Sequence, residues 1–180
     1  MPFTVYHFGP SGFLGLSLRK WLDVPVVLLA NVIVDVEVLA SPGWDFHRYW
    51  HWHSLLVGAG VGMLLGVAMY PLRGVFKKIM NLLRVGYEPG FWKMVISGIV
   101  GVWLHVLVDA IYHYDVQPFW PFYKRNPLFK LLSQGDVKLV CAIFFIPAVV
   151  VYALAVRSYI RQKSKPQQEQ ELSRAPGDTR

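Results

Sequence analysis

The sequence predicts an all-α integral membrane protein, a helical bundle of four transmembrane helices plus an N-terminal half-membrane helix. Of its 180 residues, 54% are hydrophobic and only 16% are charged, and the mean hydropathy is +0.38. Soluble domains carry about 25% charged residues. Crossing the hydrocarbon core takes about 20 mainly apolar residues, and runs close to this length recur along the chain.

The predicted segments follow one another without a second domain or an internal repeat. The first, Phe8–Leu18, is apolar but too short to cross, and it is the predicted half-membrane helix. The predicted full spans are Val24–Ala40, Ser54–Leu72, Met94–Tyr112 and Val137–Val156. Residues 1–157 therefore form the predicted helical membrane domain. Residues 158–180 are polar and poor in apolar side chains, so we expect a disordered tail there.

Positive charge is unevenly distributed over the two sides of this bundle. Of the 18 Lys and Arg residues, 13 fall before the first full span, between the second and third, or after the fourth. Basic residues collect in cytoplasmic loops, which places these segments and the C-terminus in the cytoplasm. The loops at 41–53 and 113–136 are then external. Because topology explains the formal net charge of +7, we expect no nucleic-acid partner.

Ionisable side chains occur within or at the ends of the apolar segments. Such groups are costly at membrane depth and mark functional sites. His, Asp and Glu provide the nitrogen and oxygen donors that divalent metals use. The residues concerned are His7, Asp35, Glu37, His47, His51, His53, His105, Asp109 and His113. With the predicted topology they converge on the external side of the bundle, which predicts a metal site there.

Three of these residues share a predicted depth. His7, Asp35 and His105 each lie twelve residues from a charged residue at the predicted cytoplasmic boundary. At 1.5 Å per residue, each would stand about 18 Å above that boundary. The N-terminal segment is then a helix that runs inward and forms a hairpin with the first full span. We therefore expect His7 to lie within reach of Asp35 and His105.

Spacing along the helices divides the set further. His105, Asp109 and His113 recur every four residues and form one polar stripe. Glu37 lies two residues from Asp35, so it points elsewhere and could accept the ring N–H of a ligating histidine. The alternative for His113 is a hydrogen-bonded packing residue, and histidines at the rim could face water.

Small residues recur every four positions on two of the predicted spans. They are Gly58, Gly62 and Gly66 on the second, and Ser97 and Gly101 on the third. Stripes of this kind let helices approach closely in lipid, which would bring the two spans together. A homodimer face is the competing interpretation.

Several short motifs, in this order, resemble a family of small bacterial inner-membrane proteins described as membrane-bound metal-dependent hydrolases. They are Pro2-Phe3-Thr4-Val5-Tyr6-His7-Phe8-Gly9-Pro10, Leu29-Ala30-Asn31-Val32-Ile33-Val34-Asp35-Val36-Glu37, His47-Arg48 followed by His51, His105-Val106-Leu107-Val108-Asp109 and Trp120-Pro121-Phe122. The resemblance covers about residues 2–122 and implies a location in the bacterial inner membrane. That family is distantly similar to zinc-dependent phospholipase C and related single-strand nucleases, which implies phosphoester hydrolysis.

The chain departs from the family pattern at two places. Many members carry Thr-His-Ser after His-Arg, where this chain has His51-Trp52-His53-Ser54. The sequence therefore leaves open whether His51 or His53 is the ligand. Glu37 stands where many members have Asp, a change that a metal would tolerate.

The residues and the resemblance together predict a metal-dependent hydrolase that holds two or three divalent ions, and the imidazole content favours zinc. The predicted ligands are His7, Asp35, His47, His51, His105 and Asp109, with Glu37 as general base or orienting group and Arg48 as a phosphate-binding residue. Membrane lipids surround the bundle, and the expected substrate is a lipid-linked phosphoester at the external face.

Two other functions fit part of the pattern. A metal or proton transporter would also bury His and Asp, but the cytoplasmic halves of the predicted spans are nearly free of ionisable groups. An accessory membrane protein, with a structural metal or none, fits everything except the surplus of ligands.

Overall fold

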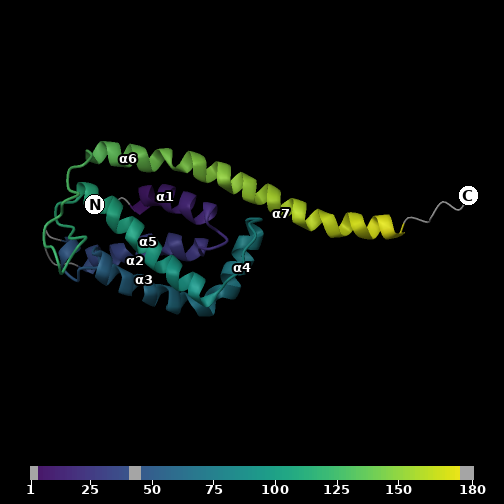
Figure 1. Ribbon diagram of the computed structural model, residues 1–180, viewed down its shortest axis with the longest axis horizontal. Helices are drawn as coiled ribbons and strands as arrows, with labels where there is room; N and C mark the ends of the chain where they lie inside the picture. The colour runs from purple at the N-terminus through teal and green to yellow at the C-terminus, as the bar shows by residue number, and fades with distance from the viewer. Residues whose placement is uncertain (1–3, 41–45, 175–180) are drawn as a thin grey trace, which may run out of the picture.

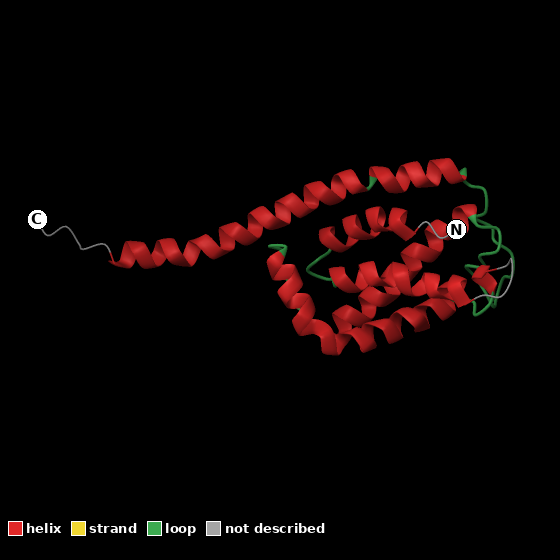
Figure 2. Ribbon diagram, turned by 180° about the vertical axis from the view of Figure 1, so that it is seen from behind, coloured by secondary structure: helices red, strands yellow, loops and turns green. Residues whose placement is uncertain are grey.

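The computed structural model describes residues 4–40 and 46–174, which form helices joined by loops, with no strand among them (Figure 1, Figure 2). The predicted all-α class is confirmed. The helices are α1 (Thr4–Ser17), α2 (Val24–Ala40), α3 (Leu55–Met69), α4 (Arg73–Leu82), α5 (Phe91–Tyr112), α6 (Gln134–Ile143) and α7 (Phe145–Arg174), with 3-10 turns η1 (Phe46–Arg48) and η2 (Tyr70–Leu72). Residues 1–3 of the predicted membrane domain and 175–180 of the predicted tail lie outside the described residues.

Within the described residues, three stretches are long and apolar enough to cross a membrane: Leu55–Leu82, Phe91–Tyr112 and Gln134–Ser164. They contain three of the predicted spans. α2 has the predicted bounds, and its 17 residues extend about 25 Å, somewhat less than the hydrocarbon core. α1, with 14 residues, extends about 21 Å and reaches partway through the core. The chain is a helical membrane protein, and the count of four full spans stays a prediction.

α5 is the helix around which the others are arranged (Figure 1). It packs along α3 and α2 and also contacts α1 and α6. Its apolar stretch is 56% buried, against 22% and 17% for the other two candidate spans, so those two present most of their surface to lipid. Val34 of α2 meets Val102 and Val106 of α5 in a fully buried contact. α1 lies between α2 and the pair formed by α6 and α7.

Glycines set the close contact between α3 and α5. Gly58, Gly62 and Gly66 are buried on one face of α3. A Cβ atom at Gly62 would collide with the backbone of Gly98 on α5, and one at Gly98 would collide with the carbonyl oxygen of Gly62. The predicted close approach of the second and third spans is confirmed. The small residues of these two helices pack against each other within one chain.

A polar contact at the predicted cytoplasmic end determines how far α2 is shifted along α5. The backbone N–H of Asp23 donates a 2.6 Å hydrogen bond to Ser97 Oγ, and Tyr87 Oη donates one of 2.6 Å to Asp23 Oδ2. From this contact α2 and α5 run in parallel towards the other end of the bundle. Asp35 and Asp109 each lie twelve residues beyond it, about 18 Å along their helices. The contact therefore sets Asp35 and Asp109 level with each other.

The segment after α3 is helical where the sequence predicts only a cytoplasmic loop. The turn η2 contains Pro71, which interrupts the helix because it has no backbone N–H. α4 then turns across the end of the bundle (Figure 1). Phe76 and Met80 are buried, whereas Lys77 and Lys78 are exposed. An amphipathic helix with a basic polar face is suited to lie along a membrane surface.

α7 continues to Arg174, through a segment for which the sequence predicts a disordered tail. The membrane-spanning part has already nucleated the helix, so each further residue adds a hydrogen bond at little extra cost. Gln, Glu, Lys and Arg dominate this segment and are good helix formers, although their low apolar content is also typical of disorder. The end of α7 projects beyond the other helices (Figure 1).

Replacing Gly62 by Ala should lower the thermal stability of the purified protein in detergent. The new methyl group would collide with the α5 backbone at Gly98, and overpacking of this kind costs roughly 1–3 kcal/mol. Gly60 is the matched control, because a Cβ atom there has nothing within 4 Å and alanine is the better helix former. Circular dichroism melts should show a lower Tm for Gly62→Ala alone. Equal Tm values for the two variants would contradict this packing.

The predicted topology places Lys78 in the cytoplasm and Arg125 outside. Both side chains are exposed, so cysteines introduced at these positions in a Cys141→Ser background can be labelled. An impermeant thiol reagent should label Arg125→Cys in intact spheroplasts and reach Lys78→Cys only after lysis. Preferential labelling of Lys78→Cys before lysis would invert the topology and move the external face to the cytoplasm.

Candidate metal centre

Asp109, near the C-terminal end of α5, lies at the centre of a group of histidines. Its Oδ1 atom is 2.9 Å from Nε2 of His7, and its Oδ2 atom is 3.2 Å from Nε2 of His105. Nε2 of His53 and of His47 lie 3.6 Å and 3.9 Å from the same Oδ2 atom. One buried carboxylate thus faces imidazoles that come from α1, the turn η1, the loop before α3, and α5 itself.

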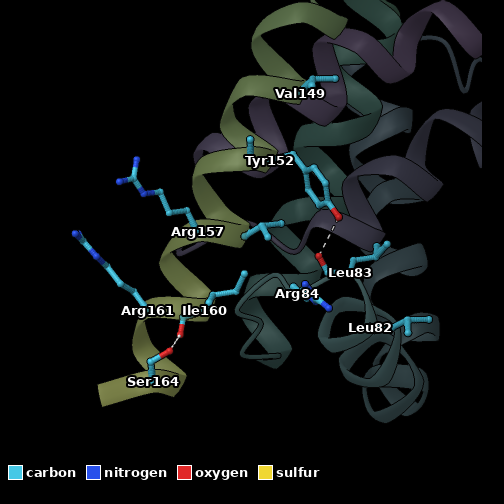
Figure 3. A pocket seen from close by; sticks show the side chains of 11 residues that line it. Leu82, Leu83, Arg84, Val149, Tyr152, Arg157, Ile160, Arg161 and Ser164 are labelled. Atoms are coloured by element: carbon cyan, nitrogen blue, oxygen red, sulfur yellow. Dashed lines mark hydrogen bonds between the residues drawn. The ribbon is translucent and has the colours of Figure 1, made fainter. Parts of the chain in front are cut away.

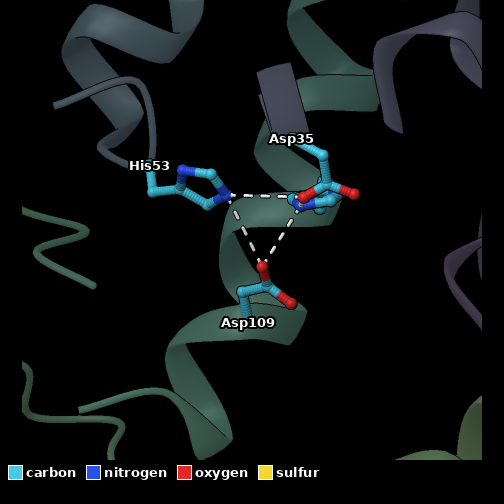
Figure 4. A group of neighbouring side chains, drawn as sticks. Asp35, His53 and Asp109 are labelled. Atoms are coloured by element: carbon cyan, nitrogen blue, oxygen red, sulfur yellow. Dashed lines mark ion pairs between the residues drawn. The ribbon is translucent and has the colours of Figure 1, made fainter. Parts of the chain in front are cut away.

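A compact set of metal donors is formed by Asp35, His53, His105 and Asp109 (Figure 4). All four residues are buried, and one donor atom of each lies within 4.8 Å of the others. Asp35 Oδ1 is 3.3 Å from Nε2 of His105 and 3.9 Å from Nε2 of His53. Donors held roughly 2.0–2.1 Å from a tetrahedral zinc ion lie about 3.3 Å from one another. The observed separations therefore fit an ion between them.

The hydrogen bonding of this set also fits a cation. Nε2 of His53 and Nε2 of His105 are buried and have no hydrogen-bond partner among the described residues. Buried polar atoms normally find a partner, so an exception needs a physical reason. Both nitrogens lie 3.2–3.9 Å from carboxylate oxygens of Asp35 and Asp109, and a divalent ion between these atoms would satisfy them together.

Two further carboxylates hold the histidines from behind. Glu37 Oε2 is 2.9 Å from Nδ1 of His53, and Asp115 Oδ2 is 2.7 Å from Nδ1 of His47. We assign the ring proton to Nδ1 in both histidines, which leaves Nε2 as the lone-pair donor facing Asp109. Burial alone would raise the pKa of Asp115, but the hydrogen bonds and the charge interaction with His47, together with a backbone hydrogen bond at Asp115 itself, outweigh burial and lower that pKa, which keeps the carboxylate ionised.

Glu37 is fully buried, and both of its oxygens accept hydrogen bonds. Oε1 accepts from the backbone N–H of Trp50 at 2.7 Å, and Oε2 accepts from the backbone N–H of His53 at 3.2 Å as well as from its ring. The sequence left two roles for Glu37. The geometry favours orienting a histidine, because a general base has to come within hydrogen-bond reach of the substrate or its water.

A second group of donors, His47, His113 and Asp115, adjoins the first beyond the end of α5. The ring centroid of His47 lies 4.4 Å from that of His53 and 4.4 Å from that of His113, so the two groups are continuous. Burial lowers the pKa of His113 to about 4, which keeps its imidazole neutral at pH 7. Its side chain is 19% exposed and marks the side on which the groups approach solvent.

The N-terminal helix brings His7 to these groups. Its ring stacks on that of His105 with the centroids 4.2 Å apart, and its Nε2 is 2.9 Å from Asp109. The prediction that His7 lies within reach of His105 is confirmed. α1 and α2 form the predicted hairpin, and a hydrogen bond of 3.1 Å from Ser11 Oγ to Asn31 Oδ1 joins them.

Of the two histidines between which the sequence left the choice open, the structure brings His53 into the donor group and leaves His51 outside it. We correct the expected placement of His51 accordingly. His51 has a φ of 56° and begins a tight turn, in which Ser54 N and Ser54 Oγ both donate to its carbonyl oxygen. Its ring stacks on Trp120 with the centroids 4.2 Å apart. The turn directs the two histidines to different surroundings. Helical spacing in the sequence does not predict this turn.

Two more side chains border the groups. Arg48 Nε donates a 3.2 Å hydrogen bond to the backbone oxygen of Asp115, and Tyr112 Oη donates one of 3.1 Å to Asp109 Oδ1. Asp115 is not among the residues predicted from the sequence, because it lies in a loop where helical spacing no longer applies. Its position two residues after His113 was the one available signal.

Comparison with known proteins gives the family. Residues 13–166 match the YdjM inner membrane protein family. The chain belongs to this family. The match contains every residue of both donor groups and begins after His7. It confirms the expected inner-membrane protein, and the family description carries no activity. No curated protein and no solved structure matches the chain.

Replacing Asp109 by Asn should remove most of the metal bound by the purified full-length protein, because this carboxylate faces all four histidines. Glu37→Gln should weaken metal affinity by roughly 10–100-fold, the usual effect of losing a partner that orients a ligand. Elemental analysis after dialysis against limiting zinc measures both effects. Asp136→Asn is the matched control, since it makes the same charge change at an exposed helix cap. Wild-type metal content in Asp109→Asn would contradict the assignment.

Proposed function

We propose that this chain is a metal-dependent hydrolase of the inner membrane that cleaves a phosphoester bond of an amphiphilic substrate at the external membrane boundary. The observation that carries the proposal is the position of Asp109, whose carboxylate faces four histidines, two of them held by further carboxylates. A structural zinc site is complete with four ligands. The surplus of donors favours more than one ion and a role beyond stability.

The residues divide this work among themselves. Asp109 presents Oδ1 towards His7 and Oδ2 towards the other histidines, so it is suited to lie between two cations. Glu37 and Asp115 keep two imidazole rings aimed before a substrate arrives. Bound divalent cations, with zinc favoured by the imidazoles, supply Lewis acidity that activates water at neutral pH and polarises the phosphoryl group.

A cleft of about 430 Å³ beside Tyr112 offers a place for the substrate. Tyr112 connects this cleft to the donor groups, because it lines the cleft and its hydroxyl donates to Asp109. Lys130 contributes a positive charge to the lining, and Phe129 and Leu132 contribute apolar surface. This mixture suits a phosphorylated head group attached to a hydrocarbon chain. Arg48, beside Asp115, is a second candidate for contact with the phosphate.

The interior on the other side of the donor groups favours a hydrolase over a transporter. Between these groups and Asp23, α2 and α5 present the fully buried side chains Val26, Val27 and Val102. Asn31, the polar residue of α2 in this region, is hydrogen-bonded to Ser11. A transport path requires polar or hydrated surroundings that continue across the membrane. The apolar contacts supply no such continuation.

The proposal is tested with full-length protein in detergent, assayed against a phospholipid, a lipid-linked phosphate and a chromogenic phosphodiester, with and without a chelator. The zinc-loaded wild type should hydrolyse at least one of them, and chelation should abolish the activity. Asp109→Asn and His105→Ala should each lower kcat/KM by roughly 100-fold or more, because direct ligands matter more than their supporting partners. Glu88→Gln, which makes the same charge change at an exposed position outside this cleft, should retain wild-type activity. Activity that survives chelation and both substitutions would overturn the proposal in favour of an accessory membrane protein.

A further inference from the structure

A second cleft lies between α4 and α7, at the opposite end of the bundle from the donor groups (Figure 1, Figure 3). Its volume is about 1010 Å³. The C-terminal end of α4 and the residues after it form one wall, and one face of α7 forms the other. A smaller cleft of about 600 Å³ continues from it along the same two elements. Neither cleft takes part in the proposed hydrolysis.

The lining changes from apolar to basic along α7. Val149, Ala153 and Val156 line the part that lies within the predicted span Val137–Val156. Arg157 and Arg161 follow on the same helix and line the cleft, and Figure 3 shows their guanidinium groups extending away from the α4 wall. Arg84 belongs to the opposite wall, and none of the described residues that line the two clefts is acidic. The lining of the cleft is therefore amphipathic, with an apolar part and a basic part.

The walls of the cleft are held in place by direct contacts. Tyr152 Oη on α7 donates a 3.0 Å hydrogen bond to the carbonyl oxygen of Leu83, which follows α4 (Figure 3). Arg84 adopts a φ of 54°, and its backbone N–H donates to Asn81 O, so the chain turns sharply after α4. This turn places Arg84 opposite the basic end of α7 instead of extending it away along the α4 axis.

We propose that this cleft binds one anionic phospholipid of the cytoplasmic leaflet, with an acyl chain against Val149 and Val156 and its phosphate near Arg84, Arg157 and Arg161. Charge complementarity selects this occupant. A soluble anion would leave the apolar half of the cleft uncovered. A second copy of the chain would bring one basic face against another in a protein whose net charge is already +7. Basic side chains next to a membrane span attract anionic head groups.

Native mass spectrometry of the full-length protein in detergent tests the proposal, with dioleoyl phosphatidylglycerol and dioleoyl phosphatidylcholine added in equal amounts. Wild type should retain one phosphatidylglycerol in preference to phosphatidylcholine by at least about fivefold, the effect of a single basic residue near anionic lipid. The triple variant Arg84→Asn, Arg157→Gln, Arg161→Gln should lose this preference. Asn is chosen at position 84 because it tolerates the left-handed backbone there.

The matched control is Arg73→Gln, Lys77→Gln, Lys78→Gln, which removes the same charge at the same end of the bundle from residues outside both clefts. It should keep the preference for phosphatidylglycerol. Ala153→Trp, which fills the apolar part and changes no charge, should reduce retention of the lipid. The proposal would be overturned if the triple variant and its control lost the preference equally, or if wild type retained the two lipids equally. Displacement of the lipid by glycerol phosphate, or a dimer that excludes lipid, would overturn it as well.

Discussion

Much of this structure depends on one requirement, which is that the negative charge of the buried Asp109 carboxylate is compensated. A carboxylate buried at the end of a membrane helix is costly unless cations or hydrogen-bond donors surround it. Here the imidazoles that face the carboxylate, and that could share a cation with it, come from four separate segments, so these segments meet at the same point. The short α1 brings His7, and the loop before α3 folds back over Glu37 to bring His53. The contacts that assemble the donor groups therefore also hold these helices and loops together.

Two kinds of contact away from Asp109 make this convergence geometrically feasible. The hydrogen bonds among Asp23, Ser97 and Tyr87 set the shift between α2 and α5, which brings Asp35 level with Asp109. Glycines remove the side chains that would hold α3 away from α5. Close packing of helices in lipid relies on such small residues, because there is no hydrophobic effect to drive helices together. Both contacts lie far from the donor groups, yet they determine where the donor residues lie relative to one another.

The two ends of the molecule differ in chemistry as well as in charge. One end buries imidazoles and carboxylates near the loops that join the helices. The other end carries the amphipathic helix α4 and the basic part of α7, with clefts between them. Apolar contacts of α2 and α5 separate the two ends. The donor groups and the cleft between α4 and α7 therefore share no residues.

The sequence by itself determined the helical membrane class, the bounds of α2, and the convergence of His7, Asp35, His105 and Asp109, because hydropathy and four-residue spacing are local properties of helices. Only the tertiary structure decided the residues supplied by loops. The tight turn at His51 selects His53, and the loop after α5 brings Asp115 to His47 across 68 positions of sequence. Loop paths depend on long-range hydrogen bonds that no periodicity encodes. For the same reason the helical course of α4 and of the end of α7 became visible only once packing and helix propagation could act.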